Sequence, residues 1–337
     1  MSVSTIATMT GGIRPKWSVM IPAYEGGAYL EKTLSSVLIQ DPGQEAMEIE
    51  VVDDCSQREN LKEVVDRVGK GRVTYFRNPK NLGATGTFNI CIERSRGLWV
   101  HILHGDDVVL PGFYVHLCEA TGRVDVGAAF CRHVFVDEDD HWHRISNLEK
   151  KHAEVLNRIW VEDLMVKNAI QTPSIVVRRS VYEEIGGFDT RLFHTADWDM
   201  WKRIAISYPI WYEPAILACY RVHQASDTSR LVRTGRNIED LRRAIALMEQ
   251  RLPPESAKRL SDRARRHNAQ EGVWTANTML RRGDYSGAMA QAREALKTSR
   301  SFIVLKGIAG LLLRGSRRLL GQALRFGRSP APVDTPS

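Results

Sequence analysis

Residues 97–113, GLWVHILHGDDVVLPGF, join an apolar run to two adjacent aspartates and then return to apolar residues. The apolar run is typical of a buried strand, and carboxylates at the end of such a strand are costly to bury unless a positive group lies beside them. A metal ion, a neighbouring Arg or Lys, or solvent at a turn would each meet that requirement. The sequence around this stretch indicates which of them applies.

The first third of the chain alternates short β-type runs with helical stripes. The β-type runs are residues 17–22, 48–54, 73–76 and 98–103. Apolar residues at helical spacing lie between them, first Leu30, Leu34, Val37 and Leu38, and then Leu61, Val64, Val65 and Val68. Strands and helices in this order predict an α/β domain with a mostly parallel central sheet.

Polar residues follow three of these predicted strands at the point where each strand ends. They are Pro22, Tyr24 and Glu25 after the first strand, Asp53 and Asp54 after the second, and His104, Asp106 and Asp107 after the fourth. Ligands of an open α/β sheet bind beyond the carboxyl ends of its strands. We therefore expect these residues to meet at one binding site.

A second block, residues 127–222, continues the alternation. Its predicted strands are residues 128–136 and 173–178. Ser180 and Glu183 then have the spacing of a capping box, and Gly186 is a helix stop signal. The block is therefore predicted to add strands and a short helix to the same domain.

From about residue 235 the chain becomes basic and helical. Residues 268–299 have the pattern of a helical hairpin that turns at residues 282–284, similar to one tetratricopeptide unit without a second copy. Residues 301–328 contain six basic residues and no acidic one. They suit either an interfacial helix on an anionic membrane or a helix that packs on the rest of the protein or on a partner.

Composition narrows the class of protein. Of the 337 residues, 43% are hydrophobic and 26% are charged, as in ordinary soluble proteins, and the N-terminus lacks the pattern of a secretory signal. The net charge of +7 fits anionic partners, but the basic residues lack the interleaved aromatic residues of a nucleic-acid-binding surface. We expect a cytoplasmic protein with no nucleic-acid partner.

The five cysteines are odd in number and form no CxxC pair. They are Cys55, Cys91, Cys118, Cys131 and Cys219. Most of them lie in apolar runs, so they are interpreted as reduced core residues rather than as disulfide or metal-binding cysteines.

Four motifs between residues 16 and 223 resemble those of the family 2 inverting glycosyltransferases with the GT-A fold. In chain order they are SVMIPAYEGGAYLEKTLSSVLIQ, EVVDDCS, NLGATGTFNICIERSRGLWVHILHGDD and ADWDMWKRIA. The resemblance implies a nucleotide-binding GT-A domain at residues 16–232, with a donor half at 16–123 and an acceptor half at 124–232. We expect the other segments to be a flexible N-terminus at 1–15, a helical basic region at 233–328 and a disordered tail at 329–337.

The resemblance assigns a donor nucleotide pocket. Its predicted residues are Pro22, Ala23, Tyr24, Glu25, Asp53, Asp54, Asn81, Gly83, Asn89, His104 and Asp106. Asp54 and Asp53 would accept hydrogen bonds from the base or ribose, and glycine lets the backbone approach the ligand. The alternative for the aspartates is a helix N-cap, which is compatible with binding because one side chain can cap while the other binds.

The family usually has Asp-x-Asp at the predicted metal site, where the resemblance implies Mg²⁺ or Mn²⁺ on the donor diphosphate. Here His104 replaces the first acid. On an extended strand His104 and Asp106 would point to one side and Asp107 to the other. Asp106 and His223 are the predicted metal ligands, Asp107 has a supporting role, and His104 contacts ribose or phosphate. The alternative is a solvated turn.

The segment 195–205, a predicted helix, matches the region of the family's general base. Asp197 is the predicted base and Ala196 replaces the family's usual Glu, while Asp199 braces the helix. Trp198 either stacks on an acceptor sugar or lies in the core. One base suffices for a single displacement with inversion. Arg221 and His223, in an Arg-x-His motif, are predicted to hold the departing diphosphate.

The resemblance predicts transfer of a sugar from a nucleoside-diphosphate sugar, with a UDP-sugar favoured, to a hydroxyl of a glycan or lipid-linked acceptor. Bacterial-type surface polysaccharide or glycolipid synthesis, at the inner face of the membrane through residues 301–328, is the pathway that this implies. One alternative is an inactive glycan- or nucleotide-binding scaffold on the same fold. The other is a nucleotidyltransferase, which would need a Gly-rich basic signature where residues 22–30, PAYEGGAYL, are acidic.

Overall fold

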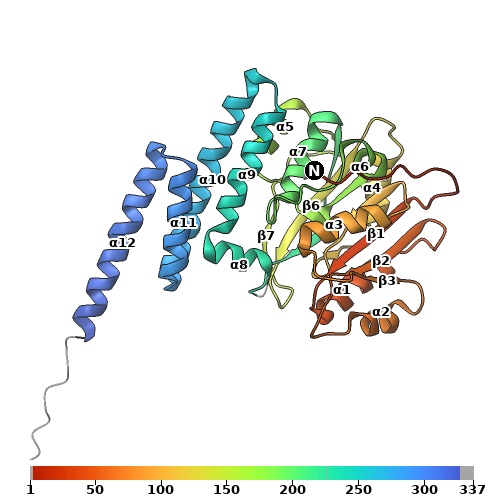
Figure 1. The fold of residues 1–337 in the computed structure, drawn as a ribbon, viewed down its shortest axis with the longest axis horizontal. Helices are drawn as coiled ribbons and strands as arrows, with labels where there is room; N and C mark the ends of the chain where they lie inside the picture. The colour runs from red at the N-terminus through yellow and green to blue at the C-terminus, as the bar shows by residue number, and fades with distance from the viewer. Residues whose placement is uncertain (1–2, 225, 327–337) are drawn as a thin grey trace, which may run out of the picture.

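The computed structural model describes residues 3–224 and 226–326, with side chains described up to residue 315. A twisted central sheet lies between two layers of helices, and a group of long helices extends from one side of it (Figure 1). The predicted α/β architecture with a helical C-terminal region is confirmed.

The sheet begins with four parallel strands in the order β3-β2-β1-β4 and continues as β9-β6-β10-β5. The first four are β1 (Trp17–Ala23), β2 (Met47–Asp53), β3 (Thr74–Arg77) and β4 (Trp99–Ile102), and the next four are β5 (Val108–Val109), β6 (Ala128–Val136), β9 (Ile175–Arg178) and β10 (Ile210–Arg221). Two short strands lie off this path, β7 (Trp142–Ile145) on β6 and β8 (Glu154–Val155) on β10. The longest pairings, β1 with β2 and β6 with β10, are parallel.

Strands β1 and β2 are buried along their whole length because helices cover both faces of the sheet. Val19 and Ile21 belong to the core on one face, and Met20 belongs to the core on the other. The first core is closed by α1 (Gly27–Leu38), α2 (Leu61–Gly69) and α4 (Phe113–Thr121). The second is closed by α3 (Gly83–Arg94), α5 (Arg158–Val166), α6 (Arg179–Ile185) and α7 (Ala196–Ser207).

The C-terminal helices are not separate from the α/β core. They are α8 (Asp227–Thr234), α9 (Arg236–Arg251), α10 (Pro254–Arg282), α11 (Tyr285–Thr298) and α12 (Phe302–Phe326). Ile245 and Met248 of α9 and Leu260 of α10 are buried in the same cluster as α3 and α7. The predicted boundary between residues 232 and 233 falls inside α8. Helix α9 and the first part of α10 therefore share a hydrophobic core with the α/β domain, whereas the rest of α10, α11 and α12 form a separate cluster.

The predicted hairpin at residues 268–299 is present. Gly283 ends α10 with a φ of 85°, and the Asp284 carboxylate accepts a hydrogen bond from the Gly287 N–H at 2.8 Å at the start of α11. Residues 329–337, predicted to be a disordered tail, lie outside the described residues. Among the described helices, none combines the length and the apolar character that a membrane span requires.

The flexible N-terminus predicted at residues 1–15 is packed on the domain around Ile6, whereas residues 10–13 are exposed and form no helix or strand. Ile6 is 2% exposed and packs in the core beside α3 and α6, and Val3 forms a β-bridge with Asp189. The Ser4 carbonyl accepts a hydrogen bond from the Gly187 N–H at 2.8 Å. The buried Ile6 side chain and these backbone hydrogen bonds hold the start of the chain against the domain. The residue pattern there shows no helical or strand periodicity that would have predicted this.

Two smaller predictions also change. Ser180 does not cap α6, because that helix begins at Arg179 directly after β9 without a side-chain cap, whereas Gly186 ends it with a φ of 81° as predicted. Cys91, Cys131 and Cys219 are buried and Cys55 is partly buried, but Cys118 is exposed on α4. Cys118 is therefore not a core residue, since it lies on the outer face of its helix.

We predict that Ile6→Ala lowers the free energy of unfolding by about 2–4 kcal/mol, because it removes buried methyl groups and leaves a cavity. Urea unfolding followed by tryptophan fluorescence measures this change. Ile13→Ala is the matched control, since Ile13 is 99% exposed and the change should stay within about 0.5 kcal/mol. Equal small effects for both variants would contradict the packing of the N-terminal segment.

Candidate active site

A cavity of about 870 Å³ opens at the carboxyl ends of β1 and β4. It is large enough for a nucleotide-sized ligand. The structure brings most of the predicted site residues to its wall, namely Pro22, Ala23, Tyr24, Glu25, Asp54, Asn81, Gly83, His104, Asp106, Asp197, Trp198, Arg221 and His223. The predicted residues Asp53 and Asn89 do not line it.

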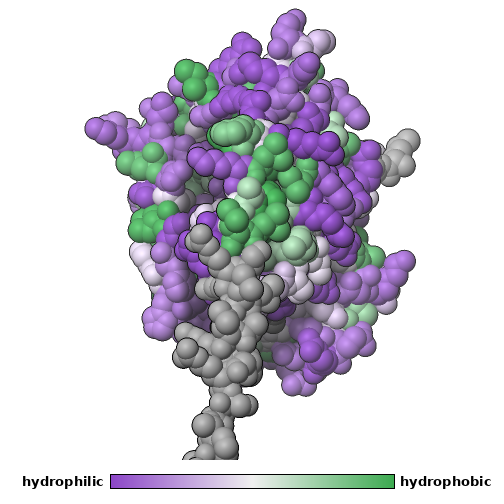
Figure 2. Space-filling model, turned by 90° about the vertical axis from the view of Figure 1, so that its left-hand side faces the viewer, coloured by the Kyte–Doolittle hydropathy of each residue, from purple (hydrophilic) through white to green (hydrophobic). Residues whose placement is uncertain are grey.

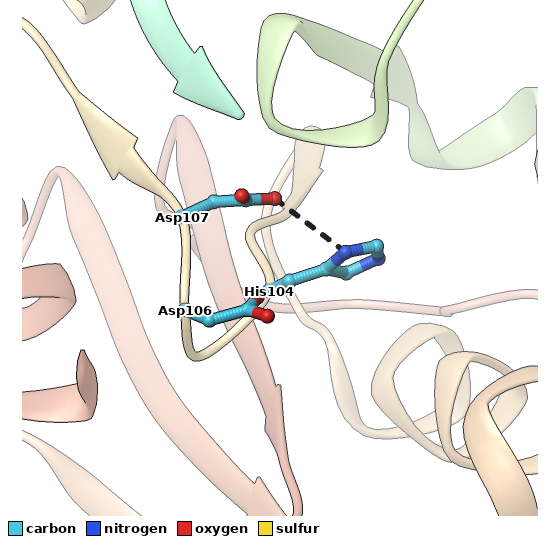
Figure 3. A group of neighbouring side chains, drawn as sticks. All are labelled: His104, Asp106 and Asp107. Carbon is cyan, nitrogen blue, oxygen red and sulfur yellow. Dashed lines mark ion pairs between the residues drawn. The ribbon is translucent and has the colours of Figure 1, made fainter. Parts of the chain in front are cut away.

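The acidic turn after β4 lies at the base of this cavity. Strand β4 ends at Ile102, so the expectation that His104 and Asp106 alternate with Asp107 along an extended strand is wrong. The chain turns instead, and ligand atoms of the three side chains lie within 4.8 Å of one another. Figure 3 shows Asp107 directed at the imidazole of His104, with Asp106 beside them.

Glycine at position 105 lets this turn lie directly against β1. A Cβ at Gly105 would be 3.1 Å from the Cβ of Ala23 and 3.3 Å from the carbonyl oxygen of Pro22. The Gly105 N–H donates to that same Pro22 carbonyl at 3.0 Å. The turn is thus pinned to the predicted nucleotide-binding loop.

Asp107 is the buried member of the acidic pair, with 1% of its surface exposed. Its Oδ1 accepts a hydrogen bond from the backbone N–H of Arg221 at 2.8 Å, and its Oδ2 lies 3.5 Å from His104 Nδ1 without a hydrogen-bond partner among the described residues. Burial, together with the charge of Asp106, raises the pKa of Asp107 well above its usual value. The turn therefore lacks enough positive charge for two carboxylates.

Asp106 faces the cavity and is 34% exposed. Its Oδ2 lies 3.1 Å from Nε2 of His223. Burial acts to raise the pKa of Asp106, but the hydrogen bond with His223 and the nearby imidazoles outweigh it, so this pKa lies below its usual value. The two predicted metal ligands, Asp106 and His223, are therefore neighbours.

His104 has a largely structural environment. Its ring stacks on Phe88 with centroids 5.0 Å apart, and its Nε2 is buried without a hydrogen-bond partner among the described residues. Burial lowers the pKa of His104, which favours the neutral imidazole. An orphaned ring nitrogen and an orphaned Asp107 oxygen at one turn fit a group that the protein binds there.

The side chains of this turn suit a divalent cation. Carboxylate oxygens are the protein ligands that Mg²⁺ and Mn²⁺ prefer, and Asp106 and Asp107 supply them, with the imidazole of His223 adjacent. A cation would also relieve the repulsion that raises the pKa of Asp107. The residues present therefore fit the predicted metal.

Arg221 does not reach into the cavity as a free cation. Its Nε donates to the Asp106 carbonyl at 2.9 Å, its Nη1 donates to the Asp137 carbonyl at 2.7 Å, and its Nη2 pairs with Asp140 at 2.5 Å. The side chain is 1% exposed and lies 4.9 Å from the ring of Tyr29. Arg221 is therefore not available for the predicted diphosphate contact, because all three of its guanidinium nitrogens bind other groups of the protein.

Two other arginines line the cavity and remain exposed. Arg144 of β7 lies over the ring of Phe135 at 4.0 Å, and Arg230 of α8 pairs with Asp227 at 2.9 Å. Neither residue belongs to a motif that sequence analysis recognised. They reach the cavity only because β7 and α8 fold back over the sheet edge.

Asp54 organises the loop before α3. Its Oδ1 accepts from Asn78 Nδ2 at 2.9 Å and from the Leu82 N–H at 2.8 Å, and its Oδ2 accepts from the Gly83 N–H at 2.8 Å. Asn81 Nδ2 donates to the Asp54 carbonyl at 3.2 Å. The capping alternative thus applies to Asp54, but at the start of α3 rather than of the helix that follows it in sequence.

Two residues predicted to contact the donor, Asp53 and Asn89, are buried and do not face the cavity. Asp53 is 0% exposed, and its carboxylate is occupied by Ser56, Tyr75 and Arg77. Asn89 is 4% exposed and exchanges two hydrogen bonds with the backbone of Phe188. Both side chains hold loops together beneath the cavity.

Tyr24 and Glu25 form the outer wall. Tyr24 is 53% exposed. The Glu25 carboxylate accepts hydrogen bonds from the backbone N–H groups of Gln57, Arg58 and Glu59. Burial opposes these bonds, but together with the charge of Arg58 they hold the pKa of Glu25 below its usual value. Glu25 therefore fixes the neighbouring loop, and the ring of Tyr24 stays open to a ligand.

Asp197 lies in the first turn of α7 and lines the cavity. Its Oδ2 accepts a hydrogen bond from Asn168 Nδ2 at 3.1 Å, and its Oδ1 accepts from the Trp198 N–H at 2.7 Å. Burial raises the pKa of Asp197 to about 6, although both hydrogen bonds and Lys202 act in the opposite direction. A carboxylate with this pKa suits a general base near neutral pH.

The residues around Asp197 are structural. Trp198 is 1% exposed, its indole N–H donates to the Leu164 carbonyl at 2.7 Å, and Lys202 lies over its ring. Its acceptor-stacking role is therefore corrected in favour of the core alternative. Asp199 pairs with Arg251 of α9 at 2.5 Å, as its expected bracing role requires.

The loop before α7 depends on a residue that sequence analysis missed. Asp240 of α9 is 0% exposed, and its Oδ2 accepts from the N–H groups of His194 and Thr195, each at 2.9 Å. It also accepts from the Thr195 hydroxyl at 2.9 Å. No local pattern marks Asp240, because its partners lie more than forty residues earlier in the chain.

Related proteins are known from sequence. A family profile described as "Glycosyl transferase family 2" matches residues 18–186. An uncharacterized protein of Mycobacterium tuberculosis (strain CDC 1551 / Oshkosh) is 30% identical over 256 residues, 73% of this chain and 79% of that protein. An uncharacterized glycosyltransferase of Rickettsia felis is 24% identical over 218 residues, 64% of this chain and 36% of that protein.

Similar solved structures are GT-A glycosyltransferases. Residues 1–349 of S. aureus TarS superpose with a TM-score of 0.61 at 13% identity, over 94% of this chain and 93% of TarS 1–349. The mannosyltransferase PcManGT from Pyrobaculum calidifontis, in complex with GDP-Man and Mn²⁺, gives a TM-score of 0.57 at 17% identity, over 91% of this chain and 81% of PcManGT. The family profile covers the segment from β1 through α6, which builds the acidic turn, and the chain therefore belongs to glycosyl transferase family 2 and has the GT-A fold.

Proposed function

We propose that the protein is an inverting glycosyltransferase that moves a sugar from a nucleoside-diphosphate sugar to an acceptor hydroxyl. One observation carries this proposal. Asp106 in the acidic turn and Asp197 at the start of α7 line the same cavity. Family membership supports sugar transfer as the reaction class. The crystal structures of TarS with UDP and with UDP-GlcNAc, and the complex of PcManGT with GDP-Man, support a nucleotide-sugar donor.

The protein is further proposed to use Mg²⁺ or Mn²⁺, held by Asp106, Asp107 and His223. When bound, such a cation supplies positive charge that stabilises the diphosphate leaving group. The presence of Mn²⁺ in the PcManGT complex supports this choice. Arg144 and Arg230 take the diphosphate role first assigned to Arg221, because they are the exposed arginines on the cavity wall.

Asp197 accepts the proton of the acceptor hydroxyl in the proposed mechanism. The hydroxyl oxygen then bonds to the anomeric carbon as the bond to the diphosphate breaks, and one displacement inverts the configuration. Asn168 holds the Asp197 carboxylate in place. Tyr24, Asn81 and Gly83 surround the nucleotide of the donor. The favoured donor is a UDP-sugar.

The acceptor is proposed to be a glycan or a lipid-linked glycan of cytoplasmic surface-polysaccharide or glycolipid synthesis, on the basis of the resemblance alone. An inactive nucleotide- or glycan-binding scaffold is the second candidate, because His104 and Ala196 stand where the family usually has carboxylates. Family membership lends no support to the nucleotidyltransferase alternative.

We predict that Asp106→Asn reduces sugar-nucleotide turnover by about 100-fold or more, because the proposed cation loses its exposed carboxylate. A thermal-shift titration with UDP and Mn²⁺ should lose its metal-dependent part in the same variant. Asp125→Asn is the control, since Asp125 is exposed between α4 and β6 and belongs to neither group of potential metal ligands among the described residues. Unchanged metal dependence in Asp106→Asn would mean that the acidic turn binds no cation.

We predict that Asp197→Asn lowers kcat by about 100-fold to 10,000-fold while the thermal shift with UDP and Mn²⁺ stays at the wild-type value, because the general base is lost and the donor pocket is not. Steady-state kinetics with a screen of UDP-, GDP- and dTDP-sugars measure the first quantity. Wild-type protein that binds a nucleotide but turns over none of these donors would favour the scaffold instead.

The pH profile tests the assignment of the base. Because Asp197 is active when deprotonated and its pKa is about 6, kcat/KM should rise with pH through about 6. Asn168→Ala removes a hydrogen bond to the charged carboxylate, so it should raise this pKa and move the acid limb to higher pH. Gln171→Ala, elsewhere on the cavity wall, should leave the limb in place. If Asn168→Ala and Gln171→Ala show the same acid limb of the pH profile, the group that titrates there is not Asp197.

A further inference from the structure

Helix α12 uses only part of its apolar surface to pack on the protein. Val304, Ile308 and Leu311 are 0%, 8% and 4% exposed, and their spacing of four and three residues places them on one side of the helix. They join the cluster formed by α10 and α11. Gly307 allows close packing there, because a Cβ at this position would be 2.7 Å from Cγ1 of Val273.

A second apolar stripe on α12 is left outside this packing. Phe302, Leu305, Leu312 and Leu313 are 78%, 47%, 53% and 64% exposed. With the exposed Ala309 they lie within about 100° of one another around the helix axis, so they form a continuous stripe beside the buried one. Ile303, 63% exposed, lies outside this stripe, on the far side of Lys306. Figure 2 shows hydrophobic side chains gathered in the middle of this face of the molecule, with hydrophilic surface on either side.

Basic residues follow on the next side of the same helix. Lys306 and Arg314 are exposed and eight residues apart, so they lie about 80° apart around the helix axis, with Lys306 next to the stripe. The Arg314 guanidinium donates a hydrogen bond to Asn277 Oδ1 of α10. Residues 299–326 contain no Asp or Glu. The exposed surface of α12 therefore presents an apolar stripe with the positive charge of Lys306 beside it.

This combination identifies the partner. A second copy of the chain would cover the apolar stripe, but in a symmetric contact between two α12 helices Lys306 would meet no acidic side chain of the other helix, because residues 299–326 contain no Asp or Glu. The surface of an anionic bilayer covers apolar side chains and attracts Lys and Arg at the same time. We propose that the exposed face of α12 binds an anionic lipid surface, a property that does not depend on the proposed sugar transfer.

Co-sedimentation with vesicles tests this proposal on the full chain. The probes are phosphatidylcholine vesicles with and without about a third of phosphatidylglycerol. Wild-type protein should sediment with the anionic vesicles and much less with the neutral ones. The double variant Leu305→Ser/Leu312→Ser should weaken binding at least tenfold, because both side chains lose apolar area. Lys306→Gln should weaken binding about fivefold, as expected for one charge near an anionic surface.

The control is Val115→Ser, which changes an apolar side chain of α4 that is 78% exposed. It should bind vesicles like the wild type, and all variants should keep the wild-type melting temperature because the substituted side chains are exposed. The proposal is overturned if the double variant binds as well as the wild type, or if the wild type ignores anionic vesicles. A concentration-dependent dimer that the double variant abolishes would assign the stripe to a second copy.

Discussion

The burial of Asp107 beside Arg221 is the constraint on which the site depends. A buried carboxylate is stable only with partners, and the backbone N–H of Arg221 supplies one at 2.8 Å. The guanidinium of the same residue holds the Asp106 carbonyl and the turn between β6 and β7. A single arginine at the end of β10 therefore joins the acidic turn after β4 to the second half of the sheet. This arrangement leaves Asp106 as the carboxylate that faces the cavity, with His223 two residues beyond Arg221 at its side.

The other half of the cavity depends on helices that follow the family segment. Asp240 of α9 holds the loop that leads into α7. Arg251 of α9 pairs with Asp199, which lies one turn after the start of α7. These contacts set the position of Asp197, whose carboxylate is fixed on its other side by Asn168. The C-terminal helices are thus part of the framework of the site rather than an appendage. Their shared core with α3 and α7 gives this coupling a physical basis, since close-packed interiors transmit displacements.

Two departures from the usual family pattern are matched by nearby groups. His104 stands in place of an acid, and it stacks on Phe88 with its ring nitrogen beside Asp107, so the turn keeps its shape without a third carboxylate. Ala196 stands where the family usually has a Glu, directly before the proposed base Asp197, and Asn168 supplies a polar contact to Asp197 from another part of the chain. In the second case the group that orients the carboxylate comes from outside its motif.

The sequence by itself determined the alternation of strands and helices, the acidic turn at a sheet edge and the family, because hydrophobic periodicity and motif order are local properties. It also predicted Asp106, His223 and Asp197 as site residues, and all three line the cavity. Only the tertiary structure decided that Asp53, Asn89, Trp198 and Arg221 are occupied inside the protein, and that Ile6 of the N-terminal segment is buried in the core. The physical reason is that a polar side chain binds a ligand only if no protein group has already satisfied it, and most of those partners lie twenty or more residues away in sequence.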